Sequence, residues 1–223
     1  MNGKTHIAIT KKAYDLLPDV VRNFIMATED EITFWAVYPD KLDQDNIDSG
    51  YWMHSRKMTK VKNKYVWKHG SISLSIGALR WNFRTYYRTG NFVAARETLL
   101  KMFHYCIDAC TMPHVVFKEA DHIHAVFEKD MEKNVFLELA EIKTSFGPLT
   151  QPGSIYDSAT ELCEVTYEQK DKILEMYNTA GGDINKDHEY KMIILRRAVQ
   201  ACVDFVSATY LNVSMEDNLP KTE

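Results

Sequence analysis

Residues 92–114 read FVAARETLLKMFHYCIDACTMPH and carry the clearest structural signal in the chain. Pro113 lies near the end of the stretch, and proline ends a helix because it lacks the amide donor and clashes with the preceding turn. The spacing of three and four between apolar residues is that of an amphipathic α-helix. The stretch therefore predicts a helix over residues 92–111 with one apolar face, formed by Phe92, Ala95, Leu99, Phe103, Cys106 and Cys110.

Helical periodicity continues through most of the chain, and alternating strand patterns are essentially absent. Glycine and proline residues separate the helical segments, while the polar stretch 41–63 reads as a long loop. We expect an all-α fold: a single compact multi-helix domain over residues 1–223 with a frayed tail from about residue 212. Besides 92–111, the predicted helices cover residues 5–16, a segment starting at Pro18, and residues 66–88, 122–143, 158–178 and 186–212.

Size and composition exclude several classes of protein. A domain of 223 residues buries roughly 70% of its unfolded surface, so it needs no structural metal to stay folded. The net charge of −4 argues against a stable complex with nucleic acid. No window approaches the ~20 apolar residues of a transmembrane segment, and the first residues do not resemble a signal peptide. We expect a cytoplasmic protein as the sequence stands, or a secreted one if a leader was removed.

The cysteines carry no recognisable metal-binding or disulfide pattern. Cys106 and Cys110 lie one helical turn apart within an apolar stripe, where free thiols are common. Cys163 and Cys202 are far away in the sequence, and no CxxC pair occurs. We therefore expect four core cysteines and no zinc ribbon.

Two pairs of side chains suggest metal chemistry. His104 and Asp108 are four residues apart, as are His124 and Glu128, so each pair projects from one face of a helix. Because 31 of the 223 residues are acidic, a given histidine meets such a partner about once in seven by chance. One pair alone is most often a helix-stabilising contact worth a few tenths of a kcal/mol. The concentration of four of the eight histidines between positions 104 and 124 favours a shared metal site.

Other candidate ligands lie outside these pairs. His114 follows the proline break, Asp40 ends the sequence Tyr38-Pro39-Asp40, and His54 lies in the polar stretch. His6 stands near the start of the chain. Nitrogen and oxygen ligands without thiolate suit catalytic zinc with open positions better than a closed structural site.

This arrangement resembles the zinc-dependent phospholipase C family of bacteria, which includes the clostridial alpha-toxin catalytic domain, and the related fungal single-strand-specific zinc nucleases. The resemblance covers about residues 5–130 and includes Gly90-Asn91-Phe92 at the start of the central helix. It implies a compact helical domain with a trinuclear zinc site in a cleft. Order and spacing match for eight side chains: His6, Asp40, His54, His104, Asp108, His114, His124 and Glu128.

The resemblance also implies how up to three zinc ions are held. The first would be bound by Asp40, His54, His104 and Asp108. The second would be bound by His114, His124 and Glu128. The third would take His6, Asp108 as a bridging carboxylate, and the amino group and carbonyl of the first residue. That residue is tryptophan in the family and Met1 here.

Metal binding lowers the pKa of water to about 7, which supplies hydroxide at neutral pH. The resemblance therefore implies a hydrolase of phosphate esters, with Asp40 as the candidate for any further base assistance. We expect phospholipase C-like cleavage of a phosphodiester such as a phospholipid. A zinc nuclease or 3′-nucleotidase is the first alternative, and a non-catalytic binding protein on the same helical frame is the second.

Overall fold

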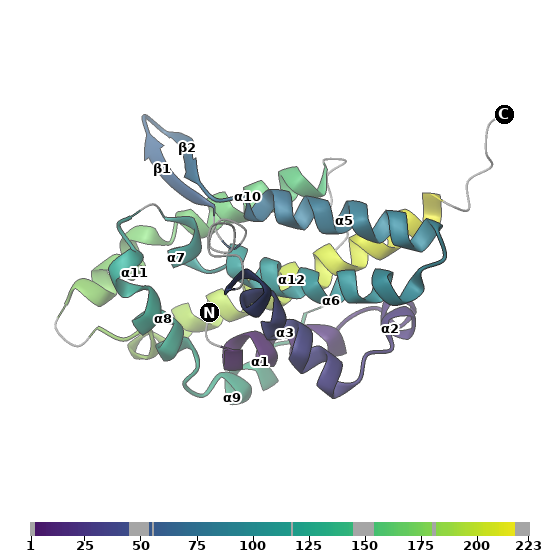
Figure 1. Ribbon diagram of the computed structural model, residues 1–223. Helices are drawn as coiled ribbons and strands as arrows, with labels where there is room; N and C mark the ends of the chain where they lie inside the picture. The colour runs from purple at the N-terminus through teal and green to yellow at the C-terminus, as the bar shows by residue number, and fades with distance from the viewer. Residues whose placement is uncertain are drawn as a thin grey trace.

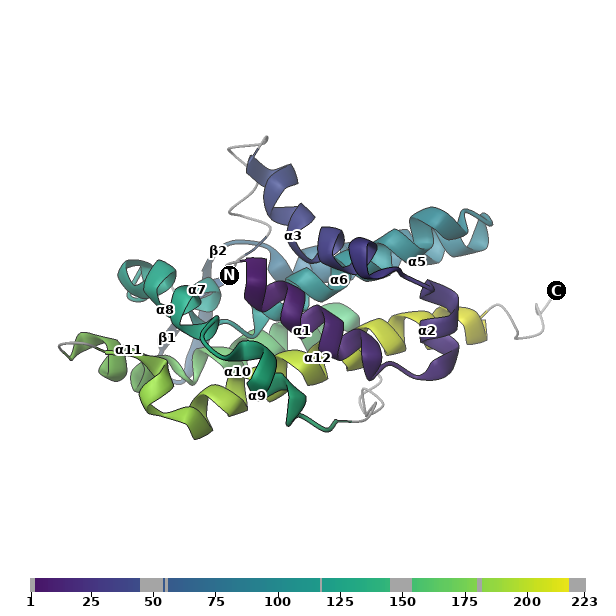
Figure 2. The same ribbon diagram turned by 90° about the horizontal axis from the view of Figure 1, so that it is seen from below.

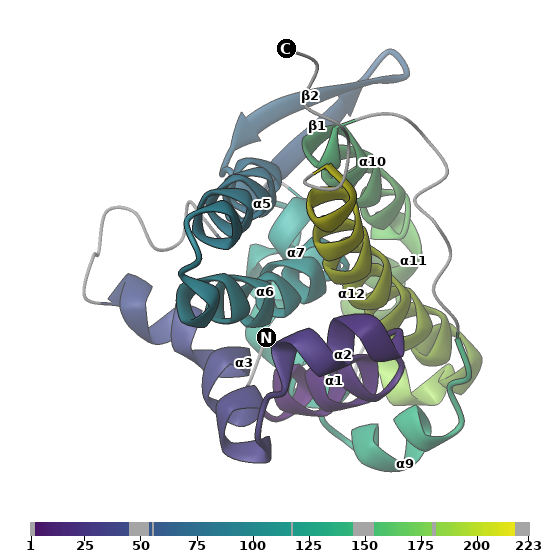
Figure 3. The same ribbon diagram turned by 90° about the vertical axis from the view of Figure 1, so that its right-hand side faces the viewer.

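Helix α6 (Phe92–Ala109) occupies the centre of the molecule. It packs against α5 (Ile72–Arg88), α12 (His188–Glu216) and α3 (Glu29–Gln44), and Figure 3 shows it enclosed by these helices. The computed structural model describes residues 3–44, 54, 56–116, 118–144, 154–179 and 182–216.

The remaining helices cover the flanks of this centre. Helix α1 lies alongside both α3 and α12, which Figure 2 shows from below. Helix α10 packs on α5. These elements are α1 (Gly3–Asp15), α2 (Asp19–Ile25), α7 (Met112–Val115), η1 (Asp121–Ile123), α8 (His124–Met131), α9 (Val135–Ala140), α10 (Ile155–Tyr167), α11 (Lys170–Asn178) and η2 (Ile184–Lys186).

The sheet of the described residues is one antiparallel hairpin, which projects beside α10 (Figure 1). Strand β1 (Lys57–Val61) pairs with β2 (Lys64–His69). Lys62 and Asn63 connect them with positive φ angles of 46° and 62°. A two-residue turn with positive φ at both positions matches the right-handed twist of the strands and favours a hairpin.

Two sequence predictions for this region are wrong. The loop expected over residues 41–63 is partly helix, because α3 runs to Gln44, and partly strand β1. The helix expected over residues 66–88 begins only at Ile72, because residues 64–69 form β2. The turn at Lys62 and Asn63 was the missed signal, since asparagine tolerates the left-handed region.

The single helix predicted over residues 122–143 is also wrong. The segment is divided into η1, α8 and α9, and Asn134 between the last two has a φ of 59°. A residue in the left-handed region cannot continue a right-handed helix, so the chain changes direction there. The other predicted helices correspond to helices of the structure, with 158–178 divided into α10 and α11. The frayed tail expected from about residue 212 is wrong in its first part, because α12 continues to Glu216 and Val213 is fully buried.

The core is continuous around α6, and the predicted all-α fold class is confirmed. Phe83, Phe103 and Phe127 are among the largest fully buried side chains. The four cysteines are buried and form no disulfide, as the sequence predicts. Among the described residues, no helix has both the length and the apolar character needed to cross a membrane.

We expect Phe103→Ala to lower the free energy of unfolding by about 3–5 kcal/mol, because it removes a fully buried ring and leaves a cavity. Phe136→Ala is the matched control, since that ring is 56% exposed and surface changes cost about 0.5 kcal/mol or less. Urea unfolding followed by circular dichroism in the presence of a chelator measures both. Equal losses would contradict the central place of Phe103.

Candidate metal centre

The fold brings all eight described candidate ligands to one place. Six segments contribute them: α1, α3, the chain before β1, α6, α7 and α8. Met1, the ninth candidate, lies outside the described residues. The members are His6 on α1, Asp40 on α3, His54 in the chain before β1, the pair His104 and Asp108 on α6, His114 on α7, and the pair His124 and Glu128 on α8.

The carboxylate of Asp108 lies at the centre of this cluster. Its Oδ2 is 2.8 Å from His54 Nδ1 and 3.2 Å from His104 Nε2. Its Oδ1 is 3.1 Å from His6 Nε2 and 3.6 Å from His114 Nε2. With an exposure of 1%, Asp108 is surrounded by four imidazoles and connects three groups of candidate ligands.

The first group comprises Asp40, His54 and His104. Asp40 Oδ1 lies 3.4 Å from His104 Nε2 and 3.7 Å from His54 Nδ1, and those two ring nitrogens are 2.9 Å apart. His54 and His104 are buried, whereas the Asp40 side chain is 40% exposed. The group therefore opens to solvent on the Asp40 side.

The second group comprises His114, His124 and Glu128. Glu128 Oε1 is 2.7 Å from His124 Nε2 and 3.4 Å from His114 Nε2. The two Nε2 atoms are 3.2 Å apart. The third group joins His6 to His104 and Asp108 and is buried throughout.

Backbone carbonyls orient two of the rings. His104 Nδ1 donates to the carbonyl of Ala36 at 2.9 Å, and His114 Nδ1 donates to the carbonyl of His54 at 2.7 Å. A carbonyl only accepts, so each Nδ1 carries the proton. In the neutral rings, each Nε2 then presents its lone pair to the cluster, which is the arrangement of metal-binding histidines.

Lys57 ties together the segments that carry the histidines. Its side chain is buried, and Nζ donates to the carbonyl of Pro113 and, at 2.7 Å, to Asp121 Oδ1. The Arg56 amide donates to the carbonyl of His114, and a parallel bridge joins Met58 to Val116. Sequence reasoning missed Lys57, since no spacing motif distinguishes it from the other lysines.

The electrostatics of the cluster favour a cation. Burial raises the pKa of Asp108, but the charges of His114 and His104, with hydrogen bonds from His104 and His54, hold it well below its usual value. Burial lowers the pKa of His104, yet Asp108 and Asp40 outweigh burial and raise it to about 10. Burial, followed by the charge of His104, lowers the pKa of His6 to about 4. The carboxylates of Asp108 and Asp40 thus stabilise positive charge beside them.

The donor set fits zinc. Two ligands bound about 2.1 Å from a tetrahedral zinc ion lie about 3.4 Å from each other. The separations within the first and second groups run from 2.7 Å to 3.7 Å. Lone pairs and carboxylate oxygens at such distances repel one another unless a proton or a cation lies between them. The cleft predicted over the site stays a prediction, since residues 45–53 and 55 lie outside the described residues.

Comparison with known proteins identifies the fold. No family model and no curated protein matches the chain. Among solved structures, the alpha-toxin of Clostridium perfringens avian strain SWCP is similar, with a TM-score of 0.65 and 17% identity over 98% of this chain. The alpha toxin of Clostridium absonum gives a TM-score of 0.67 and 14% identity over 97%. The chain covers 65% of the length of each, and the likeness confirms the fold expected from the resemblance.

We expect Lys57→Met to weaken zinc binding at the second group about 10–100-fold, because the variant frees the segments that carry His54, His114 and His124. The number of zinc ions retained per chain is measured over a series of buffered chelator concentrations. Lys57→Met should lose about one ion at concentrations where the wild type still keeps all of its zinc. Lys60→Met is the control, since Lys60 lies on the same strand and pairs outside the cluster with Glu168. Equal retention by both variants would contradict this role.

We also expect zinc binding to release the proton held by His104. Because the pKa of that ring is raised to about 10, it carries a proton at pH 7 in the zinc-free protein. Apparent affinity should therefore keep rising with pH well above 6.5 and level off only near 10. Calorimetry in buffers of different ionisation enthalpy measures the released protons at pH 7. No release at that pH would show that His104 is already neutral or does not bind zinc.

Proposed function

We propose that the protein is a zinc-dependent phosphodiester hydrolase of the phospholipase C type. The observation that carries this proposal is the gathering of seven zinc-type side chains around an eighth, the buried carboxylate of Asp108, which four imidazoles contact. The likeness to alpha-toxin structures supports it through the fold. The resemblance of the ligand spacing to the zinc-dependent phospholipases C supplies the reaction class.

The proposed ligands are assigned by group. Asp40, His54, His104 and Asp108 form the first site, and His114, His124 and Glu128 form the second. The third uses His6 and Asp108, with Met1 outside the described residues. When bound, zinc polarises phosphoryl oxygens and lowers the pKa of a water molecule to about 7.

Exposure indicates where a substrate approaches. His6, His104 and Asp108 are at most 1% exposed and form the floor of the cluster. The side chains of Asp40, His124 and Glu128 are 40%, 24% and 16% exposed and form its rim. A phosphoryl group therefore reaches the cluster between Asp40 and the pair on α8.

Asp40 is the residue placed to handle a proton. Burial raises the pKa of its carboxyl, but the hydrogen bond and charge of His104 outweigh burial, so the pKa is lowered. Asp40 is thus a carboxylate at neutral pH. From the rim, its solvent-facing side can orient an attacking water molecule and accept its proton.

We expect Asp108→Asn to lose more zinc than His54→Ala and to abolish hydrolysis, because Asp108 contacts all three groups. Asp130→Asn is the matched control: Asp130 is also buried but pairs with Lys133 and Tyr177 away from the cluster. Elemental analysis of protein never exposed to chelator gives the zinc content. The same content in Asp108→Asn and wild type would refute the bridging role.

The substrate class requires a panel of phosphate esters. Zinc-loaded protein should release phosphorylated head groups from short-chain phospholipids, and a chelator should stop the reaction. Turnover of single-stranded nucleic acid or 3′-nucleotides without lipid turnover would instead support the nuclease alternative. Full zinc loading with no turnover on either set would leave a non-catalytic binding protein on the same helical frame.

A further inference from the structure

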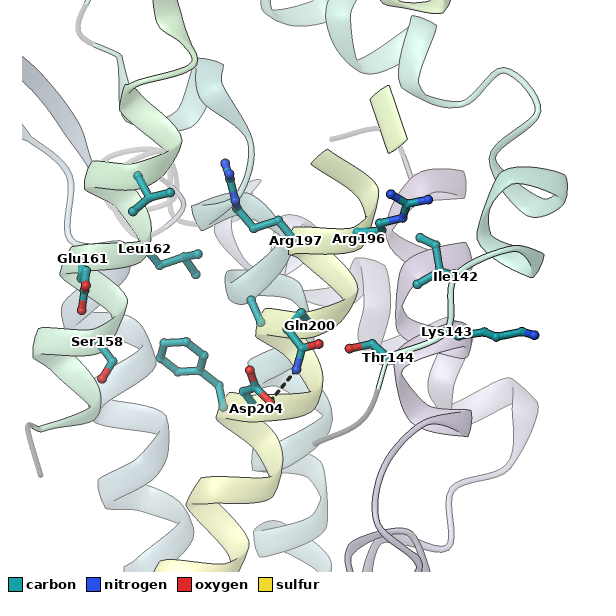
Figure 4. A pocket seen from close by; sticks show the side chains of 13 residues that line it. Ile142, Lys143, Thr144, Ser158, Glu161, Leu162, Arg196, Arg197, Gln200 and Asp204 are labelled. Carbon is teal, nitrogen blue, oxygen red and sulfur yellow. Dashed lines mark hydrogen bonds between the residues drawn. The ribbon is translucent and has the colours of Figure 1, made fainter. Parts of the chain in front are cut away.

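A cavity of about 620 Å³ lies away from the metal centre, between α10, α12 and residues 142–144 (Figure 4). This volume is typical of pockets for small organic molecules. None of the eight candidate zinc ligands lines it. Its apolar walls include Leu162 and Val165 on α10, Ala201 and Phe205 on α12, and Ile142.

The cavity and the metal centre lie on different sides of α6. His104 and Asp108 project from one face of that helix, and Cys106 and Cys110 lie about 200° around it from them. Helix α12 packs on the cysteine side, where Cys202 Sγ donates to the carbonyl of Phe103. A ligand in the cavity therefore does not touch the zinc site.

Arg197 supplies a buried polar atom of the cavity that has no hydrogen-bond partner in the described part of the chain. Figure 4 shows it leaving α12 on the side of α10, whereas Arg196 leaves on the side of Ile142. The Nη1 of Arg197 is buried and has no hydrogen-bond partner among the described residues. A buried donor of a charged group without an acceptor is costly, so this site favours an anion.

The remaining charges limit that anion to a single charge. Lys143, Arg196 and Arg197 line the cavity together with two carboxylates, Glu161 and Asp204, which leaves a net charge of +1. Asp204 accepts a hydrogen bond from Gln200 at 2.8 Å. A phosphomonoester carries close to two negative charges near pH 7 and would be repelled by both acids. A carboxylate carries one and matches the planar fork of a guanidinium.

We propose that this cavity binds an amphipathic carboxylate of the fatty-acid class. The carboxylate pairs with Arg197, and the hydrocarbon chain lies against Leu162, Val165 and Phe205. The buried Nη1 of Arg197 accounts for the charge of the ligand, and the apolar walls account for its body. The site is independent of hydrolysis at the zinc centre.

Titration calorimetry with decanoate and with decanol tests the site. Decanoate should bind one per chain and at least tenfold more tightly than decanol, because only the carboxylate pairs with Arg197. Arg197→Gln should weaken decanoate binding roughly tenfold to hundredfold and leave decanol unchanged. Arg22→Gln, a surface arginine paired with Asp19 outside the cavity, should behave as wild type.

Two controls distinguish binding at Arg197 from binding at the zinc centre and from a structural role of the guanidinium. Zinc also binds carboxylates, so each titration is run with zinc and with a chelator; binding that requires zinc and survives Arg197→Gln would overturn the proposal. Ligand-free Arg197→Gln should keep or raise the Tm, because it removes an unpaired buried donor. A Tm several degrees lower would show that Arg197 has a structural partner and would also overturn it. Equal affinity for decanoate and decanol would do the same.

Discussion

The arrangement of several segments around α6 depends on the contact between the Asp108 carboxylate and four imidazoles. An ionised carboxylate at the centre of a helical core is costly unless it is compensated from every side. His6, His54, His104 and His114 provide that compensation from four different segments. The positions of α1, α7 and the chain before β1 relative to α6 follow from this requirement as much as from apolar packing. A protein without the four rings would have to protonate Asp108 or expose it.

The sequence predicted this centre unevenly. His104 with Asp108, and His124 with Glu128, stand out because helical spacing is a local property. His6, Asp40 and His54 have no local signal, since they reach the ligands on α6 through contacts that span from 50 to 102 residues. The sequence offered them as isolated candidate ligands, and the resemblance to a known family assigned each of them to a zinc site. Lys57 had neither kind of signal, because its role depends on two partners, Pro113 and Asp121, that are distant in the sequence.

The fold was predicted better than its boundaries. The apolar period of α6 was enough to indicate a central helix, and the helical class followed from the same period elsewhere. The hairpin was missed because the two-residue turn at Lys62 and Asn63 reverses the chain without leaving any mark on the apolar periodicity. Likeness to alpha-toxin structures at 17% identity or less fits this view. Packing around such a helix depends on volume and pattern, and many sequences satisfy both.

The acceptors for His104 and His114 have a further consequence. Both are main-chain oxygens, of Ala36 and His54, so the path of the backbone fixes the orientation of each ring. A substitution at position 36 cannot remove its oxygen and can disturb the ring only by crowding it. Because Ala36 is fully buried, that position is restricted to small side chains, whereas the accepting oxygen is present with any of them. Related chains could therefore exchange alanine for glycine or serine there and still present the same lone pair to the metal centre.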